Sequence, residues 1–289
     1  MKFFLFNTFF LFSLFSFSQD KTYYFSDLSF TTIEDSLKVL GNKVLRGEND
    51  SVKMANNKIF LDVWQRALRL KGSWNFPFDS VITVARLKSK DNFMRIINWH
   101  IPFSNGTFMY YGIIQCNYPD GTREFVLNDM SEGLRNAETK TMNASKWYGA
   151  HYYKIVEPKE KKKTKSYTLL GWDGNNPYST KKIIEILSFN ENGDPVFGAT
   201  VFKGLKKMQS RFILEYNKDA FVSLKYDEKA KIIFFDRLVP RDPALEGQYE
   251  YYIPDFTHDA FKFSGGNWKF IENLDLRAKT DKKTVKNTK

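Results

Sequence analysis

The chain of 289 residues has one cysteine and three histidines, and it lacks the short motifs that identify common catalytic sites. Cys116 alone permits no internal disulfide, and its apolar setting in YYGIIQC predicts a buried, unreactive thiol. His100, His151 and His258 do not have the spacing of a zinc-binding helix. HExxH, CxxC, GxSxG, GxGxxG and the phosphate-binding GxxxxGK motif are all absent. We therefore predict no metal ligand, no cofactor and no catalytic residue.

Long apolar runs are missing as well, except at the N-terminus. MKFFLFNTFFLFSLFSFSQD has one lysine, an apolar stretch from Phe3 to Phe17 and small residues around Ser18, which is the layout of a cleavable signal peptide. The stretch is shorter than the roughly 20 residues that span a bilayer. We predict a signal peptide over residues 1–18, an exported mature chain and no membrane span after cleavage.

Positive charge is in excess, at a formal +11, but two segments hold most of it. Residues 154–165 contain six lysines and two glutamates, and residues 277–289 contain six cations and one aspartate. Neither segment interleaves aromatic residues with its cations, as a groove for single-stranded nucleic acid does. We interpret the first segment as a solvated loop and the second as a flexible basic tail, and we predict no nucleic-acid partner.

Residues 19–72 carry a helical pattern. In TTIEDSLKVLGNKVL, apolar residues recur at spacings of three and four from Ile33 to Val44, and Thr31 or Thr32 can cap the start. MANNKIFLDVWQRALRL repeats the pattern after a polar break. The two segments predict a helical hairpin whose apolar faces cover a sheet.

From Ser80 onward the apolar period becomes two, as in β-strands. Four runs with turn sequences between them predict an antiparallel meander: VITVARLKS, NFMRIINWHIPF, FMYYGIIQCNY and REFVL. WYGAHYYKIV and eight more short runs follow, several of them apolar on both faces, as in strands covered on each side. Residues 128–146 contain no long apolar run and are a candidate interior boundary or lid.

These patterns predict an α+β fold that is mainly β. The N-terminal helical hairpin, within residues 19–72, is expected to pack on a large antiparallel β domain over residues 73–276. The roughly twelve to thirteen predicted strands are too many for one open sheet, so a barrel-like, stacked-sheet or propeller-like arrangement is expected. A lipid-facing barrel is disfavoured because the strand IIEILSF places Glu185 among apolar residues.

The segment GWDGNNPYSTKK, residues 171–182, is the first candidate binding site. Trp172, Asp173, Asn175 and Tyr178 combine aromatic rings with hydrogen-bonding groups, which is the composition of a sugar-binding platform. The spacing of a calcium loop is absent. Asparagine and proline at the centre also explain an ordinary turn between two strands, and both interpretations stay open.

The segment IPDFTHDAF, residues 253–261, is the second candidate. We expect Asp255, His258 and Asp259 in one loop between strands, where an aspartate that orients a histidine supports general-base catalysis. Aspartates in such a loop also bond their own backbone, and that is the competing interpretation. Convergence of Asp173 with these three side chains in one deep pocket would favour an enzyme.

Several longer stretches carry a resemblance. SYTLLGWDGNNPYSTKKIIEILSF, GDPVFG and PDFTHDAFKFSGGNWKF, together with the helical N-terminal part and an NW strand followed by YYGIIQ, resemble a set of uncharacterised exported proteins of Gram-negative bacteria. The resemblance covers most of the mature chain. It implies export to the periplasm or cell surface, and it carries no activity and no residue role.

The sequence therefore predicts a non-catalytic binding or envelope-associated module whose partner is a glycan, a peptide or an envelope protein. A hydrolase with a site in residues 253–261 is the alternative. The oligomeric state stays open.

Overall fold

The computed structural model of the chain describes residues 29–158 and 165–275. The predicted signal peptide, the basic tail and the centre of the lysine-rich segment lie outside the described residues. The described part has two α-helices and fifteen strands in three sheets, so the fold is α+β and mainly β. In these two ranges, no helix combines the length and the apolar character needed to cross a membrane.

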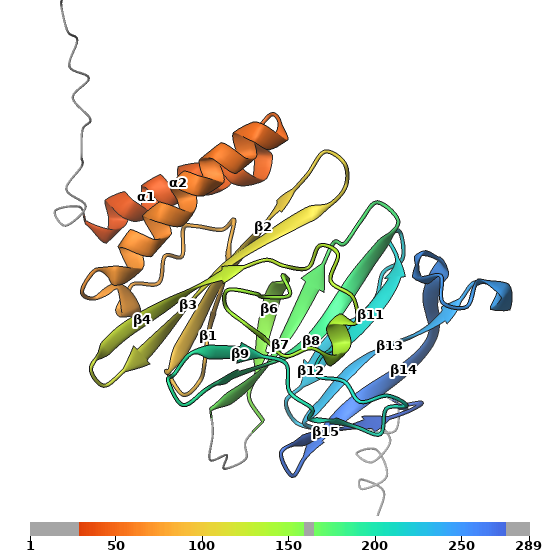
Figure 1. The fold of residues 1–289 in the computed structure, drawn as a ribbon. Coiled ribbons are helices and arrows are strands. Elements are labelled where there is room, and N and C mark those ends of the chain that lie inside the picture. Colours follow the sequence, from red (N-terminus) through yellow and green to blue (C-terminus); the bar gives the residue numbers. More distant parts are fainter. Residues whose placement is uncertain (1–28, 159–164, 276–289) are drawn as a thin grey trace, which may run out of the picture.

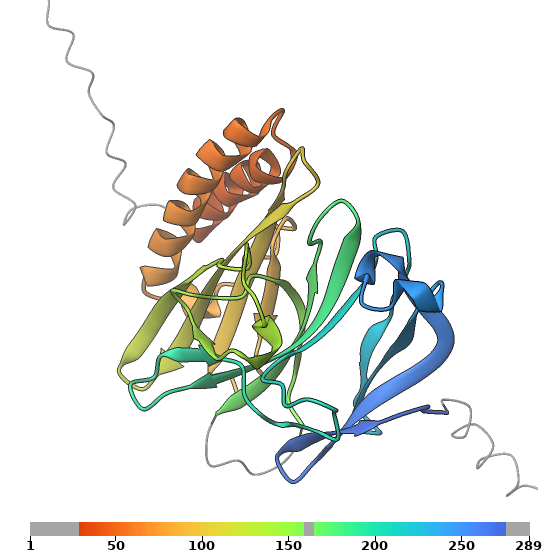
Figure 2. The same ribbon diagram turned by 45° about the vertical axis from the view of Figure 1, so that its right-hand side comes forward.

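The elements form four layers, a pair of helices and three stacked sheets (Figures 1 and 2). The helices cover one face of the first sheet, and the middle sheet packs on its other face. The third sheet packs on the far face of the middle sheet. Of the three predicted arrangements, the stacked-sheet one is therefore the arrangement that the chain adopts.

The predicted helical hairpin consists of α1 (Phe30–Arg46) and α2 (Asp50–Arg69). The α1 face predicted from the spacing is buried and includes Ile33, Leu37 and Val44. The N-cap prediction was wrong, because Ser29 rather than Thr31 or Thr32 caps the helix. The Ser29 carbonyl already accepts the first intrahelical hydrogen bond, and its side chain accepts another from the Thr32 N–H at 3.2 Å.

The first sheet is the predicted meander, with strand order β1-β2-β3-β4 and antiparallel pairing throughout. Its strands are β1 (Ala85–Lys88), β2 (Met94–Pro102), β3 (Phe108–Tyr118) and β4 (Gly121–Asn128). Successive side chains of β2 point to opposite faces. Ile97 and Trp99 enter the core beneath the helices, whereas Met94 and Ile96 enter the core against the middle sheet.

The middle sheet has the order β5-β9-β8-β7-β6, and β11 pairs with β8 beside β9. Its strands are β5 (Met142–Asn143), β6 (His151–Val156), β7 (Ser166–Asp173), β8 (Ser179–Phe189), β9 (Pro195–Phe197) and β11 (Phe212–Asn217). On β8, Ile183 and Leu187 face the first sheet, and Ile184 and Ile186 face the third. The prediction of strands covered on both sides is confirmed.

The third sheet has the order β10-β15-β14-β13-β12. Its strands are β10 (Phe202–Lys203), β12 (Leu224–Asp227), β13 (Ile232–Pro240), β14 (Tyr252–Ser264) and β15 (Asn267–Ile271). Within this sheet, the short β10–β15 pairing is parallel and the other pairings are antiparallel. Trp268 anchors this sheet to the middle one, because its buried indole N–H donates to the Thr168 hydroxyl at 3.0 Å.

The predicted loop over residues 253–261 was wrong, because these residues lie within β14. The pairing with β13 shifts between the Asp236–His258 and Leu238–Pro254 pairs, so β14 carries a bulge. Phe256 lies in that bulge with φ 66° and is 93% exposed. The residues of this bulge have a turn-like composition, which is why a loop was predicted here.

Candidate functional site

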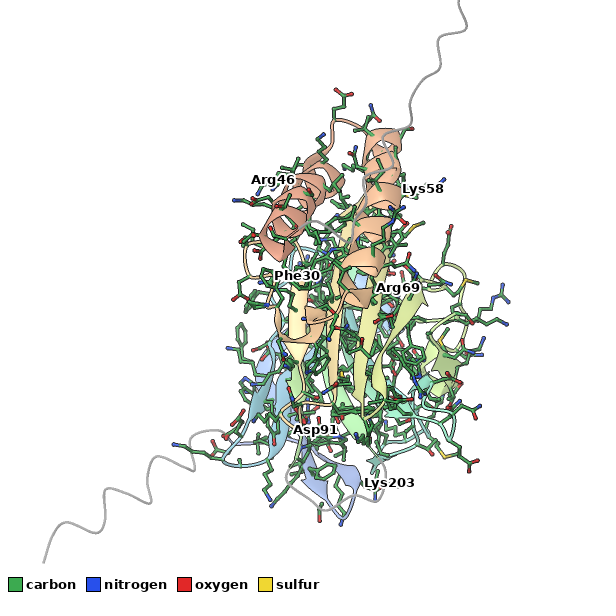
Figure 3. The ribbon with its side chains drawn as sticks, turned by 90° about the vertical axis from the view of Figure 1, so that its left-hand side faces the viewer. Phe30, Arg46, Lys58, Arg69, Asp91 and Lys203 are labelled. Atoms are coloured by element: carbon green, nitrogen blue, oxygen red, sulfur yellow. The ribbon has the colours of Figure 1, made fainter. Side chains whose placement is uncertain are left out.

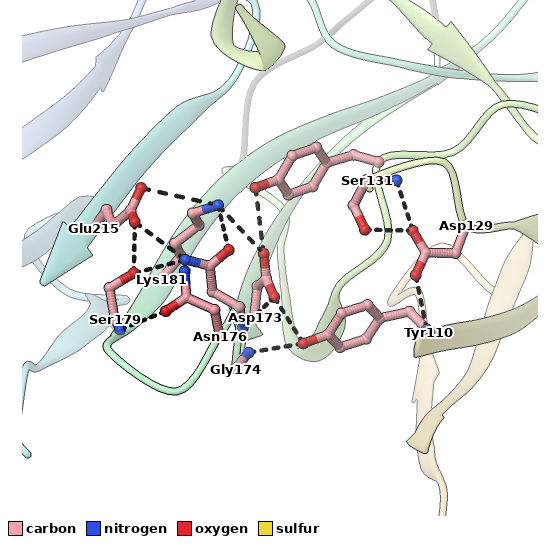
Figure 4. Close-up of polar contacts among 11 residues, drawn as sticks. Tyr110, Asp129, Ser131, Asp173, Gly174, Asn176, Ser179, Lys181 and Glu215 are labelled. Atoms are coloured by element: carbon pink, nitrogen blue, oxygen red, sulfur yellow. Dashed lines mark hydrogen bonds and ion pairs between the residues drawn. The ribbon is translucent and has the colours of Figure 1, made fainter. Parts of the chain in front are cut away.

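Asp173, the last residue of β7, is the centre of a buried polar network (Figure 4). One of its carboxylate oxygens accepts hydrogen bonds from the Tyr110 hydroxyl at 2.8 Å and the Asn175 N–H at 2.7 Å. The other accepts from the Tyr148 hydroxyl at 3.4 Å. The Tyr110 oxygen in turn accepts from the Gly174 N–H at 2.7 Å. Asp173 is therefore fixed in position and not a solvated turn residue.

The strand register places two more charges beside Asp173. Lys181 on β8 is the cross-strand partner of Asp173 on β7 and of Glu215 on β11. The Lys181 ammonium lies 4.0 Å from the Asp173 carboxylate and 3.9 Å from that of Glu215. Opposite charges on one rung of a sheet attract each other, so the lysine joins the two carboxylates across three strands (Figure 4).

The β7–β8 turn is built around its two asparagines. Asn175 has φ 52°, and its side chain donates to the Ser179 hydroxyl at 2.6 Å and accepts from the Lys181 ammonium at 2.8 Å. The Asn176 side-chain oxygen accepts from the Tyr178 and Ser179 N–H groups at 2.8 and 3.0 Å. The turn interpretation is correct for Asn176, while Asn175 belongs to both the turn and the charged network.

Burial sets the protonation of the surrounding tyrosines. Burial and then the Asp173 charge raise the pKa of Tyr110 above its ordinary value, and the same two causes in the same order raise the pKa of Tyr148. Both phenols therefore remain neutral donors at neutral pH. Burial also raises the pKa of Asp129, although Ser131 and the Tyr110 N–H donate to it. Tyr110 therefore contacts two carboxylates, Asp173 at the end of β7 and Asp129 directly after β4 (Figure 4).

A cavity of about 540 Å³ opens onto this network, and we call it the Asp173 cavity. Three segments form its wall: the β2–β3 turn with the start of β3, the loop after β4, and the β7–β8 turn with the start of β8. Its lining combines charged, amide and hydroxyl groups with apolar side chains, and it consists of Phe103, Asn105, Thr107, Phe108, Met109, Ser131, Glu132, Gly133, Leu134, Arg135, Asp173, Asn175 and Lys181.

The other residues predicted in this segment lie outside the cavity lining. Trp172 is half-buried, with its ring centroid 5.4 Å from that of His100 and 5.2 Å from that of Phe108. Tyr178 is 71% exposed at the tip of the turn. Of the four residues predicted in this segment, the structure thus brings only Asp173 and Asn175 to the cavity.

Asp255, His258 and Asp259 form no common site with Asp173. His258 Nε2 lies 3.1 Å from the Asp236 carboxylate, and Asp259 forms an ion pair with Arg237 at 2.8 Å. Asp255 accepts from the N–H and hydroxyl of Thr257 at 2.9 and 2.6 Å, as in an Asx turn. None of the three lines the Asp173 cavity.

Two of the three histidines do come together, which the sequence spacing did not indicate. His100 on β2 and His151 on β6 approach with their Nδ1 atoms 3.5 Å apart across the two sheets. Burial lowers the pKa of both rings, and for His100 the neighbouring histidine lowers it further, to about 4. No cluster of three or more metal-ligating side chains occurs within residues 29–158 and 165–275.

Tyr110, Tyr148, Lys181 and Glu215 belong to the network but were not predicted from the sequence. Asp173 and Lys181 flank one predicted turn, so hairpin pairing could have indicated this pair. Glu215 carries no comparable signal, because β11 pairs with β8 only after β9 and β10 have intervened in the chain.

Comparisons with protein-family models, with curated proteins and with solved structures found no match to this chain.

Proposed function

We propose that the protein is an exported, non-catalytic binding module that holds a short peptide, or the peptide part of an envelope polymer, in the Asp173 cavity. The periplasm or cell surface of a Gram-negative bacterium is the proposed place of action. Support for that location comes from the signal-peptide pattern and the resemblance described above.

The observation that carries the proposal is the pair of opposite charges fixed in the cavity wall. Asp173 is held by two tyrosine hydroxyls, and Lys181 is held between two carboxylates and the Asn175 amide. Neither side chain has to reorganise to meet a ligand, which lowers the entropic cost of binding. A peptide presents amide groups and charges of both signs, so it complements this wall.

The rest of the lining also suits a peptide. Glu132 and Arg135 add a second carboxylate and a second cation from the loop after β4, while Phe103 and Leu134 offer apolar contacts. The volume of about 540 Å³ lies within the usual range of ligand pockets. A glycan is less favoured, because a sugar platform needs an open aromatic face and the Trp172 ring does not line the cavity.

The hydrolase alternative has little support from the geometry. His258 contacts Asp236 on the neighbouring strand β13, and Asp259 forms an ion pair with Arg237. A general base needs a reacting group within hydrogen-bond reach in a pocket. Within the described residues, His258 and Asp259 are thus paired inside the third sheet, and neither lines the Asp173 cavity.

The experiment uses the mature chain and calorimetric titration with three probes: a muropeptide that contains sugar and peptide, its free peptide stem, and the peptide-free disaccharide. We expect the first two to bind and the disaccharide to fail. Lys181→Gln should weaken binding about tenfold or more, as loss of a charge-assisted hydrogen bond does. Lys182→Gln is the matched control, because Lys182 is the next residue on β8 and does not line the cavity.

Three results would contradict the proposal. One is equal affinity of wild type and Lys181→Gln for the peptide stem. Another is failure of all three probes to bind. The third is binding of the disaccharide that Trp172→Ala abolishes and Lys181→Gln leaves intact, which would favour a sugar platform at Trp172 instead.

A further inference from the structure

A second cavity, of about 280 Å³, lies at the edge of the first sheet, and we call it the Trp74 cavity. It lies between the helix-facing side of β1 and β2 and the segment that follows α2, which includes the short helix η2 (Ser73–Asn75), and it is open to solvent. The lining consists of Trp74, Asn75, Phe76, Pro77, Asp79, Arg86, Leu87, Lys88, Arg95 and Ile97. It shares no residue with the Asp173 cavity.

Three cations share one face of the β1–β2 ladder in this cavity. Lys88 on β1 is directly opposite Arg95 on β2, and Arg86 follows two residues away from Lys88 on the same side. Like charges directly opposite each other destabilise a strand pair. The lining contains a single carboxylate, Asp79, whose side chain is 81% exposed and lies 3.8 Å from Arg86. The cavity wall therefore carries an excess of positive charge.

The two arginines donate hydrogen bonds to other groups of the protein. Arg95 is buried, and it donates to the Gln115 side chain and to the carbonyls of Ser73 and Phe76 at 2.8, 2.8 and 2.9 Å. Arg86 donates to the carbonyls of Val81 and Asp79. Both guanidinium groups are therefore held rigidly beside the cavity.

Lys88 differs from the two arginines, because its ammonium contacts an aromatic ring. Lys88 is exposed, and its ammonium lies over the Trp74 ring, 4.5 Å from the centroid. Burial and then the Arg95 charge lower the pKa of Lys88. Its ammonium is the donor that the fold leaves available in this cavity.

We propose that the Trp74 cavity is a binding site for a small organic anion, whose phosphate or carboxylate oxygens meet Lys88 in the field of Arg86 and Arg95. The anion offsets the repulsion between Lys88 and Arg95, which face each other across the strand pair. Ile97 and the ring of Phe76 also line the cavity and give a short apolar or aromatic body of the ligand a place to pack. The site is independent of the peptide-binding role proposed above.

The test is a calorimetric titration of the mature protein at neutral pH and low ionic strength with inorganic phosphate, acetate and benzoate. We expect saturable binding of phosphate or of the carboxylates, with benzoate tighter than acetate because its ring reaches the apolar lining. A preference for phosphate or for the carboxylates identifies the head group of the ligand. Binding should weaken with added salt, since exposed charges are screened.

Lys88→Glu separates this site from a merely structural lysine. The variant replaces opposed cations by an opposite-charge pair with Arg95, so the ligand-free protein should be at least as stable as wild type while anion binding falls about tenfold or more. Lys58→Gln is the control, because Lys58 is an exposed lysine on α2 away from the cavity lining (Figure 3). Equal binding by wild type and Lys88→Glu, or no binding of any probe by wild type, would overturn the proposal.

Discussion

Glu185 and Arg211 form an ion pair of 2.7 Å in which neither side chain is exposed to solvent. Glu185 projects from β8 toward the first sheet, and Arg211 also donates to the carbonyls of Ala137 and Lys140. The pair therefore joins β8 to the loop that follows β4. This buried ion pair explains why Glu185, an acidic residue, occurs among the apolar residues of the strand IIEILSF.

Arg211→Met should destabilise the protein by about 3–5 kcal/mol, because it leaves the buried Glu185 carboxylate without its counter-charge. Urea denaturation of wild type and variant measures this difference. Arg66→Met is the comparison, since Arg66 pairs with Asp62 at 2.9 Å in an exposed position and such pairs contribute about 1 kcal/mol or less. Equal losses in the two variants would show that the buried pair has no special role.

Tyr110→Phe should cost about 1–3 kcal/mol of stability, because one hydroxyl serves two buried partners. It donates to Asp173 and accepts from the Gly174 N–H, so the variant removes one of the donors to Asp173 and leaves the Gly174 N–H without this acceptor. Tyr178→Phe removes the same atom from an exposed ring and should change stability by less than about 0.5 kcal/mol. Thermal denaturation of the two variants side by side decides whether the network around Asp173 is stabilising.

Gly174→Ala should destabilise the β7–β8 turn by about 1–3 kcal/mol, as overpacking of a filled site does. A Cβ atom at this position would overlap the ring of Phe108, although the backbone conformation itself suits alanine. The double variant with Phe108→Leu removes the ring and should recover part of the loss. Denaturation midpoints that show no recovery would point to another cause than this contact.

The alternation of side chains explains how much of the fold the sequence could predict. The meander from β1 to β4 and the two-sided burial of β8 follow from the spacing of apolar residues. Alternate residues of a strand point to opposite faces of the sheet, so the sequence of a strand shows whether one face or both are apolar. The bulge in β14 could not be predicted in this way, since Asp255 and Thr257 are residues typical of loops but lie within a continuous strand.

The candidate sites were harder to predict than the strands, because several of their contacts join residues far apart in the sequence. Asp173 and Lys181 flank a turn of known length, so their pairing is a local property of the sequence. Glu215 joins them only because β11 returns to β8, and His100 meets His151 only because two sheets stack. Contacts between distant strands depend on global register, which no local pattern specifies.

The histidine pair predicts a loss of stability in weak acid. Burial lowers the pKa of His100 from 6.5 to about 4, and the pKa of His151 is lowered as well. A base with a lowered pKa in the folded state binds more protons when unfolded, so its contribution is complete above the unfolded pKa and is lost as pH falls. Between pH 6.5 and pH 4, wild type should lose about 1–3 kcal/mol more than His100→Phe does. Denaturation at a series of pH values tests this, and parallel curves for the two proteins would refute it.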